Sequence, residues 1–149
     1  AVVCNELNKA GEPMPACQIL IYPATRMVNF ETESRRELDT GVTLDKRLID
    51  YFNDMYLGGI DYDEEDPRLS PALVEELSGV PPAHIITAEY DPLRDEGEEY
   101  GRLLNQAGVA ATYHCYEGLM HNFILQTAVV PAANRAVKDC AGFLRHQLQ

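Results

Sequence analysis

The 149-residue sequence predicts an α/β fold in which strands of a parallel sheet are flanked by helices, and we expect one domain over residues 1–149. Two observations lead to this prediction. The apolar runs Ile19–Tyr22 and Ile85–Ile86 show little alternation with polar residues, which is typical of strands that are covered on both faces. From residue 83 onwards, strand and helix patterns take turns, which indicates parallel strands joined by right-handed helical crossovers.

The amino-terminal part of the chain begins with a predicted helix over residues 1–10. Its apolar residues follow the i, i+4, i+7 spacing of one helix face: Val3, Leu7 and Ala10. Glycine and proline residues then end the helix. A strand over residues 17–22 follows and stops at Pro23. Residues 24–40 are mixed and polar, and they predict a long loop that could contain a helical turn. Loops of this length often carry function, and a solvated insertion is an equally good interpretation.

A second helix is predicted to begin at residues 43–46, with Thr43 as its N-cap, and to end at Gly58. Apolar residues at helical spacing predict a face that packs into the core: Leu44, Leu48, Tyr51, Phe52, Met55 and Tyr56. Residues 61–67 are acidic but lack the glycine and distal glutamate of an EF-hand loop, so we interpret them as a solvated loop. A short helix over residues 72–77 follows.

The carboxyl-terminal half contains the clearest alternation of elements. A strand over residues 83–90 ends at Asp91, and a helix from Pro92 to Gly108 follows it. The third predicted strand covers residues 109–117. The closing helix covers residues 131–148, and apolar residues line one of its faces: Ala133, Val137, Cys140, Ala141, Leu144 and Leu148.

Composition excludes several functional classes. The formal charge is −12 and the pI is about 4.6, so the chain would repel phosphate backbones and we expect no nucleic-acid partner. No apolar run approaches the roughly 18 residues of a membrane-spanning helix. The four cysteines have no C-x-x-C spacing and lie among apolar neighbours, so we expect no metal site and interpret them as core residues. We favour the cytoplasm as the compartment.

Two polar residues stand where neighbouring predicted strands end. Asp91 follows the second strand, and His121 comes shortly after the third. Sites in parallel α/β sheets lie beyond the carboxyl ends of the strands, so these side chains should meet although 30 positions separate them. An aspartate that accepts the Nδ1–H of an imidazole leaves Nε2 free to take a proton. The pattern therefore predicts a general-base pair at this edge.

Other candidates for proton transfer have simpler explanations. His84 begins a predicted strand, His114 lies within one, and His146 lies in the last helix, so we assign them core or surface roles. Asp95 lies one helical turn beyond Asp91, where stabilisation by the helix dipole explains it.

The segment from His84 to Phe123 resembles the carboxyl-terminal half of α/β-hydrolases of the hormone-sensitive-lipase-like esterase branch. Residues 86–97 match the acid-bearing motif of that branch. Residues 118–123 match its histidine motif, although a glycine often stands at the position of Asn122.

This resemblance extends over nearly the whole chain, because residues 20–23 and 66–71 also look like that branch. It implies the carboxyl-terminal part of an α/β-hydrolase fold, with Asp91 as the orienting acid and His121 as the general base. It further implies a serine esterase or lipase-like hydrolase that acts on short- to medium-chain acyl esters and needs no cofactor.

The sequence departs from the family pattern at the nucleophile. A G-x-S-x-G elbow and an H-G-G-G-type oxyanion loop are both absent, and Ser34, Ser70 and Ser78 lack the flanking glycines. Residues 1–10 look like the helix that normally follows the elbow. We therefore expect a carboxyl-terminal portion of an esterase that begins just past its nucleophile and is inactive by itself.

Two other functions stay open. The chain could be a non-catalytic interaction module that kept the hydrolase scaffold, or a hydrolase of amides or lactones. The strand over residues 17–22 should lie in the middle of a larger sheet, so in the isolated chain its unpaired edge is expected to cause self-association.

Overall fold

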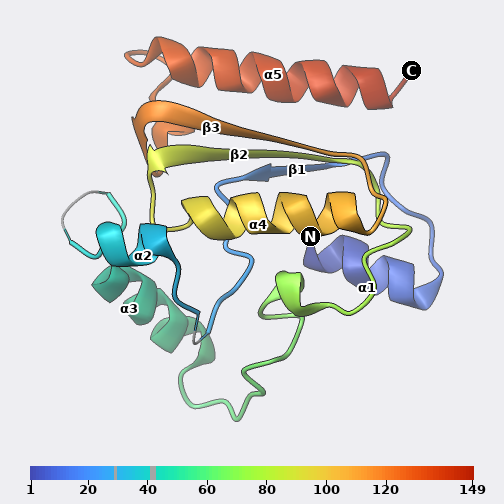
Figure 1. The fold of residues 1–149 in the computed structure, drawn as a ribbon, viewed down its shortest axis with the longest axis horizontal. Coiled ribbons are helices and arrows are strands. Elements are labelled where there is room, and N and C mark those ends of the chain that lie inside the picture. The colour runs from blue at the N-terminus through green and yellow to red at the C-terminus, as the bar shows by residue number, and fades with distance from the viewer. Residues whose placement is uncertain (29, 41–42) are drawn as a thin grey trace.

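The computed structural model describes residues 1–28, 30–40 and 43–149 (Figure 1). The helices and strands follow one another in this order: α1 (Val2–Ala10), β1 (Gln18–Ile21), α2 (Glu33–Glu37), α3 (Lys46–Leu57), β2 (Ala83–Tyr90), α4 (Arg94–Gln106), β3 (Ala111–Met120) and α5 (Pro131–Gln147). Two short 3₁₀ helices, η1 (Pro71–Leu73) and η2 (Phe123–Gln126), complete the set. Within the described residues, each helix is too short or too polar to cross a bilayer.

The three strands form a parallel sheet in the order β1-β2-β3, which confirms the predicted fold class. Helix α5 covers one face of this sheet, and α4 and α1 lie on the other (Figure 1). The central strand β2 is the most protected, with Ile85 and Ile86 fully buried. Successive side chains of a strand point to opposite faces, so Ile85 packs on the α4 side and Ile86 on the α5 side.

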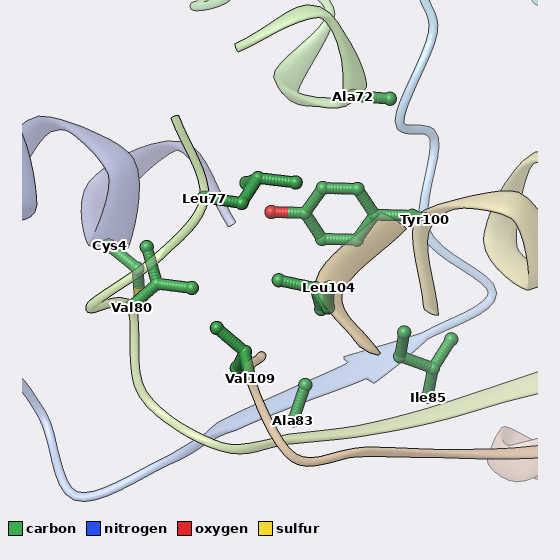
Figure 2. Packing of buried hydrophobic residues seen from close by; sticks show 9 residues of the cluster. All are labelled: Cys4, Ala72, Leu77, Val80, Ala83, Ile85, Tyr100, Leu104 and Val109. Atoms are coloured by element: carbon green, nitrogen blue, oxygen red, sulfur yellow. The ribbon is translucent and has the colours of Figure 1, made fainter. Parts of the chain in front are cut away.

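The larger core cluster lies between β2, α4 and the segment that precedes β2 (Figure 2). Tyr100 and Leu104 of α4 are fully buried in it, and Leu77 and Val80 face them from that segment. The spacing of four between Tyr100 and Leu104 puts both on one helix face, as the sequence predicted. This packing fixes the start of α4, directly after β2.

The predicted buried face of α1 was wrong. Val3 is 68% exposed, whereas Cys4 and Asn5 are buried. The helix packs on the segment before β2: Cys4 joins the same core cluster as Val80, and the Asn5 side chain donates a hydrogen bond to the Pro71 carbonyl at 3.4 Å. The helix is therefore rotated by about one residue, 100°, from the face that apolar spacing selected.

The prediction that α3 presents a core face was also wrong. Its apolar side chains are largely exposed, with Met55 at 69% and Tyr56 at 67%, and only Leu57 within the helix is buried. The N-cap is Asp45 rather than Thr43, because Asp45 Oδ1 accepts a hydrogen bond from the Leu48 N–H at 2.8 Å. The helix ends at Gly58, as predicted.

Smaller differences concern the bounds of elements. Within the predicted loop over residues 24–40, the helical turn that the sequence allowed is the short helix α2, whereas the predicted helix over residues 72–77 is replaced by η1. Strand β3 runs three residues further than predicted, to Met120. On α5, Ala133 and Cys140 are buried as predicted, whereas other residues assigned to the same face are exposed: Val137, Leu144 and Leu148.

Candidate active site

Asp91 lies directly after β2 and is fully buried. Its Oδ1 accepts a hydrogen bond from the Leu93 N–H at 2.9 Å, which ties the carboxylate to the turn before α4. Its Oδ2 lies 2.7 Å from Nδ1 of His121, which follows β3. The two side chains that the sequence placed at one edge of the sheet therefore do meet.

The contact between Asp91 and His121 determines what the imidazole can do. A carboxylate can only accept hydrogen bonds, so Nδ1 of His121 carries the proton that is donated to Asp91. In this tautomer, Nε2 presents a lone pair. The His121 side chain is 14% exposed, so it lies near the surface although its partner is buried. The pair is thus arranged to accept a proton at Nε2.

Two further residues hold His121 in place. The ring of Tyr22, just after β1, lies 4.5 Å from the imidazole, measured between ring centroids. The Thr43 hydroxyl donates a hydrogen bond to the His121 carbonyl at 3.0 Å. Burial and the negative charge of Asp91 raise the pKa of the Tyr22 phenol, which favours a neutral ring beside the imidazole. Neither residue was predicted to contact His121, because nothing in their local sequence pattern indicates a long-range contact.

Backbone strain is concentrated at this site. Among the described residues, the non-glycine residues with a left-handed backbone are Tyr22, with φ of 36°, and Asn122, with φ of 67°. One contacts the His121 ring and the other follows His121 directly. Strained backbone is typical of functional sites, where the surrounding structure holds it in place. Asparagine tolerates this conformation better than most residues.

A cavity of about 680 Å³ opens beside His121. Its walls are mostly apolar, and they come from α1, β1, α3, the residues just before α3 and the segment that precedes η1: Val2, Leu20, Leu44, Phe52, Tyr56 and Leu69. The guanidinium-bearing residue Arg35 also lines it. A site with apolar walls and a proton acceptor at one end suits a small, largely apolar molecule with one polar group.

Arg35 is held by a buried ion pair with Glu96 of α4. Arg35 Nη2 lies 2.6 Å and Nε 3.0 Å from Glu96 Oε2, and Glu96 is fully buried. Glu96 Oε1 also accepts hydrogen bonds from the N–H groups of Thr25 and Arg26. Burial raises the pKa of Glu96, and the Arg35 guanidinium together with these N–H groups opposes that shift. The network fastens the segment over residues 24–40 to α4.

The three serines take no part in this geometry. Ser34 and Ser70 are fully buried: the Ser34 hydroxyl donates to the Pro92 carbonyl at 2.9 Å, and Ser70 Oγ accepts from the Met27 N–H at 3.0 Å. Ser78 is exposed. No hydrogen bond joins a serine hydroxyl to His121 in the described part of the chain, so a nucleophile of this type is not found next to the base.

The competing candidates lie elsewhere. His84 and His114 are on the sheet, and His146 is on α5. Asp95 accepts hydrogen bonds from the Ser34 N–H and from Arg94, so it has a structural role at the start of α4. Across residues 1–28, 30–40 and 43–149, no cluster of three His, Cys, Asp or Glu side chains could hold a metal ion, and every cysteine is free.

Comparisons with known proteins agree with this architecture. The family model described as the alpha/beta hydrolase fold matches residues 1–125. The carboxylic ester hydrolase LipN of Mycobacterium tuberculosis is 44% identical over 128 residues, which cover 83% of this chain and 34% of LipN. The esterase LipI of the same organism is 37% identical over 136 residues, which cover 91% of this chain and 42% of LipI.

Solved structures show the same likeness. A thermostable esterase from Pseudomonas putida ECU1011 superimposes with a TM-score of 0.92 at 37% identity, over 99% of this chain and 47% of the esterase. This chain therefore spans less than half the length of each relative named here. On the match to the family model and these likenesses, the chain belongs to the α/β-hydrolase family and, within it, to the hormone-sensitive-lipase-like esterases.

Proposed function

We propose that this chain supplies the acid and the base of a carboxylic-ester hydrolase of the Ser-His-Asp type. The observation that carries the proposal is the 2.7 Å contact between Asp91 Oδ2 and His121 Nδ1 beyond the ends of β2 and β3. The printed names of LipN and LipI, a carboxylic ester hydrolase and an esterase, support the same reaction class.

The chemistry follows from the tautomer of His121. A serine hydroxyl placed at Nε2 would lose its proton to the imidazole as its oxygen bonds to the acyl carbon of an ester. The imidazolium then gives that proton to the departing alkoxide as the bond from the acyl carbon to the alkoxy oxygen breaks. Water attacks the acyl-enzyme with the same proton transfers and releases the acid. Asp91 holds the imidazole in orientation and stabilises its positive charge at each stage.

We propose that the nucleophile comes from outside residues 1–149. The start of α1 supports this, because Ala1 and Val2 line the same cavity as His121. A residue that precedes α1 would thus lie at the cavity that His121 also lines. The oxyanion donors would come from outside these residues as well, so we expect the chain by itself to hydrolyse no ester above background.

The apolar cavity supports short- to medium-chain acyl esters as the substrate class. Its volume of about 680 Å³ falls within the range of small-molecule sites, and its apolar walls favour an acyl or alkoxy chain over a charged group. Helix α3 contributes Phe52 and Tyr56 to these walls, so a helix that packs poorly into the core still has a place in the site.

A chimera tests the proposal. This chain would replace the matching 47% of the Pseudomonas putida ECU1011 esterase, and hydrolysis of a chromogenic short-chain ester would be measured. We expect His121→Ala or Asp91→Asn to lower kcat by about 10⁴-fold or more, as losses of triad members do. The matched control, His146→Ala on the exposed side of α5, should keep full activity. Full activity in the His121→Ala chimera would refute the role of His121.

A non-catalytic interaction module is the second candidate, and the absence of a G-x-S-x-G elbow from the 149 residues is the observation that favours it. The same chimera separates the two. A chimera that folds, as judged by a cooperative thermal transition, but hydrolyses no ester would support the module and contradict the enzyme.

A further inference from the structure

A shift in strand pairing brings His121 level with Asp91. Along β2, the partner of each residue on β3 lies 28 positions later as far as Ala88, which pairs with Tyr116. At Tyr90 the partner lies 30 positions later, at Met120. With the first offset, Asp91 would stand opposite Leu119. The second offset puts it opposite His121, so two extra residues in β3 create the contact.

These extra residues form a bulge around Gly118, and the carboxylate of Glu89 holds it. Gly118 has a φ of 72°, which leaves its N–H outside the regular ladder. That N–H donates to Glu89 Oε2 at 2.6 Å. The carbonyl of Glu89 in turn accepts from Arg94 Nη1 at 3.0 Å, which fastens this part of β2 to α4. The bulge is thus attached to the element that also carries Asp91.

We propose that Glu89 is a positioning residue for the acid–base pair. Its carboxylate stabilises the bulge in β3, and the bulge sets the register in which His121 Nδ1 reaches Asp91. A bulge next to a site commonly redirects a side chain, and an acceptor within the chain can hold the N–H that the bulge releases from the ladder, although Gly118 itself is exposed. Glu89 is the half-buried side chain that provides this acceptor. The inference rests on the proposed role of His121 for its effect on catalysis, but not for its effect on geometry.

The first test compares Glu89→Ala, Glu89→Gln and the control Glu117→Ala. Glu117 is adjacent to Gly118, is exposed and makes no side-chain hydrogen bond among the described residues, so its removal changes the same charge but keeps the hydrogen bond between the Gly118 N–H and Glu89. In the chimera, we expect Glu89→Ala to lower kcat by about 10- to 100-fold with little change in KM, because a misplacement of about 1 Å can cost 10²-fold. Glu89→Gln keeps an acceptor oxygen and should recover most of the loss.

Solvent exchange of the His121 Nδ1 proton, measured by NMR on the 149-residue chain, gives a readout that does not depend on hydrolysis. We expect Glu89→Ala to speed this exchange by about tenfold or more, as an order of magnitude for a weakened charge-assisted hydrogen bond. Glu117→Ala should leave it unchanged. If Glu89→Ala and Glu117→Ala behave alike in both measurements, the proposal is overturned. An inactive chimera would refute the proposed function, whereas the NMR comparison would still decide the role of Glu89.

A second pair of variants separates the register from stability. Gly118 and Gly108 both have a positive φ, 72° and 81°, and a Cβ added at either meets no atom within 4 Å. Gly118→Ala and Gly108→Ala should therefore lose similar thermal stability through backbone strain. Only Gly118→Ala should speed the exchange of the His121 Nδ1 proton. Equal exchange rates in the two variants would contradict a role for the bulge.

Discussion

Helices α3 and α4 have the same kind of amphipathic sequence but different surroundings. In α4, Tyr100 and Leu104 are fully buried between the sheet and the segment before β2 (Figure 2). In α3, Phe52 and Tyr56 have the same spacing of four and are 53% and 67% exposed. Periodicity therefore predicted both helices and the face on which apolar residues gather, but it did not predict whether another element covers that face.

The difference shows what each helix contributes. The buried face of α4 stabilises the sheet and fixes the turn that carries Asp91. The exposed face of α3 lines part of the cavity next to His121 through Phe52 and Tyr56. A substitution on the buried face of α4 should lower the free energy of unfolding, and a substitution on the exposed face of α3 should change it little.

The ion pair between Arg35 and Glu96 joins α2, the short helix before α3, to α4, and its loss is expected to have the largest effect. Arg35→Met leaves Glu96 buried without its charged partner, which should cost about 3–5 kcal/mol in the free energy of unfolding. Urea denaturation measures this cost, and limited proteolysis should show faster cleavage within residues 24–60. The control Lys46→Met breaks an exposed pair with Asp50 and should change neither measurement. An equal response of the two variants would contradict the role of the buried pair.

Truncation of matched side chains on the two helices tests the comparison directly. Leu104→Ala removes a fully buried side chain from α4 and should lower the free energy of unfolding by about 2–5 kcal/mol. Met55→Ala removes an exposed side chain of similar size from α3 and should change it by less than about 0.5 kcal/mol. Chemical denaturation of both variants decides the matter. A comparable loss in Met55→Ala would mean that the α3 face is covered in solution.

Strand β1 has one unpaired edge, and we predict that the chain self-associates through this edge. It pairs with β2 on one side, and no strand of the described residues pairs with its other edge. This edge includes Ile19 and Ile21, so unpaired backbone groups lie next to apolar side chains there. Sedimentation velocity of the 149-residue chain should show association that grows with concentration. A sharp monomeric boundary at high concentration would count against this prediction.

The smallest expected effect is on the pH dependence of stability. It involves helix α5, which covers the face of the sheet opposite α4. His84 on β2 stacks on Phe143 of α5, with ring centroids 5.4 Å apart, and its buried Nε2 has no partner among the described residues. Burial lowers the pKa of His84, as does the nearby His114, while Asp139 opposes this shift. The unfolded chain therefore binds this proton more readily than the folded one.

It follows that the contribution of His84 to stability is present at neutral pH and is lost as the pH falls through about 6.5, the ordinary histidine pKa. The slope of unfolding free energy against pH between about pH 5 and pH 7 should decrease in His84→Gln. His146→Gln, on the exposed side of α5, is the control and should keep the slope. Equal slopes in both variants would show that His84 does not titrate in this range.

Much of the fold and part of the candidate site follow from local sequence. The apolar run of β2 predicts a central strand, Gly58 and Gly108 mark helix ends, and the ends of two neighbouring strands bring Asp91 and His121 to the same edge. These predictions depend on interactions within a few residues or on a general rule of parallel sheets. They need no knowledge of which distant residues meet.

The tertiary structure decided the rest, because it depends on contacts between residues far apart in the chain. The bulge at Gly118 is visible only once β3 is paired with β2, and the burial of Glu96 only once Arg35 reaches it across 61 positions. The same holds for α3, whose apolar face is a local property while its exposure depends on what packs there. Sequence pattern thus determined the strands, the longer helices and several of the residues that end them, and long-range packing determined register, burial and the partners of the site.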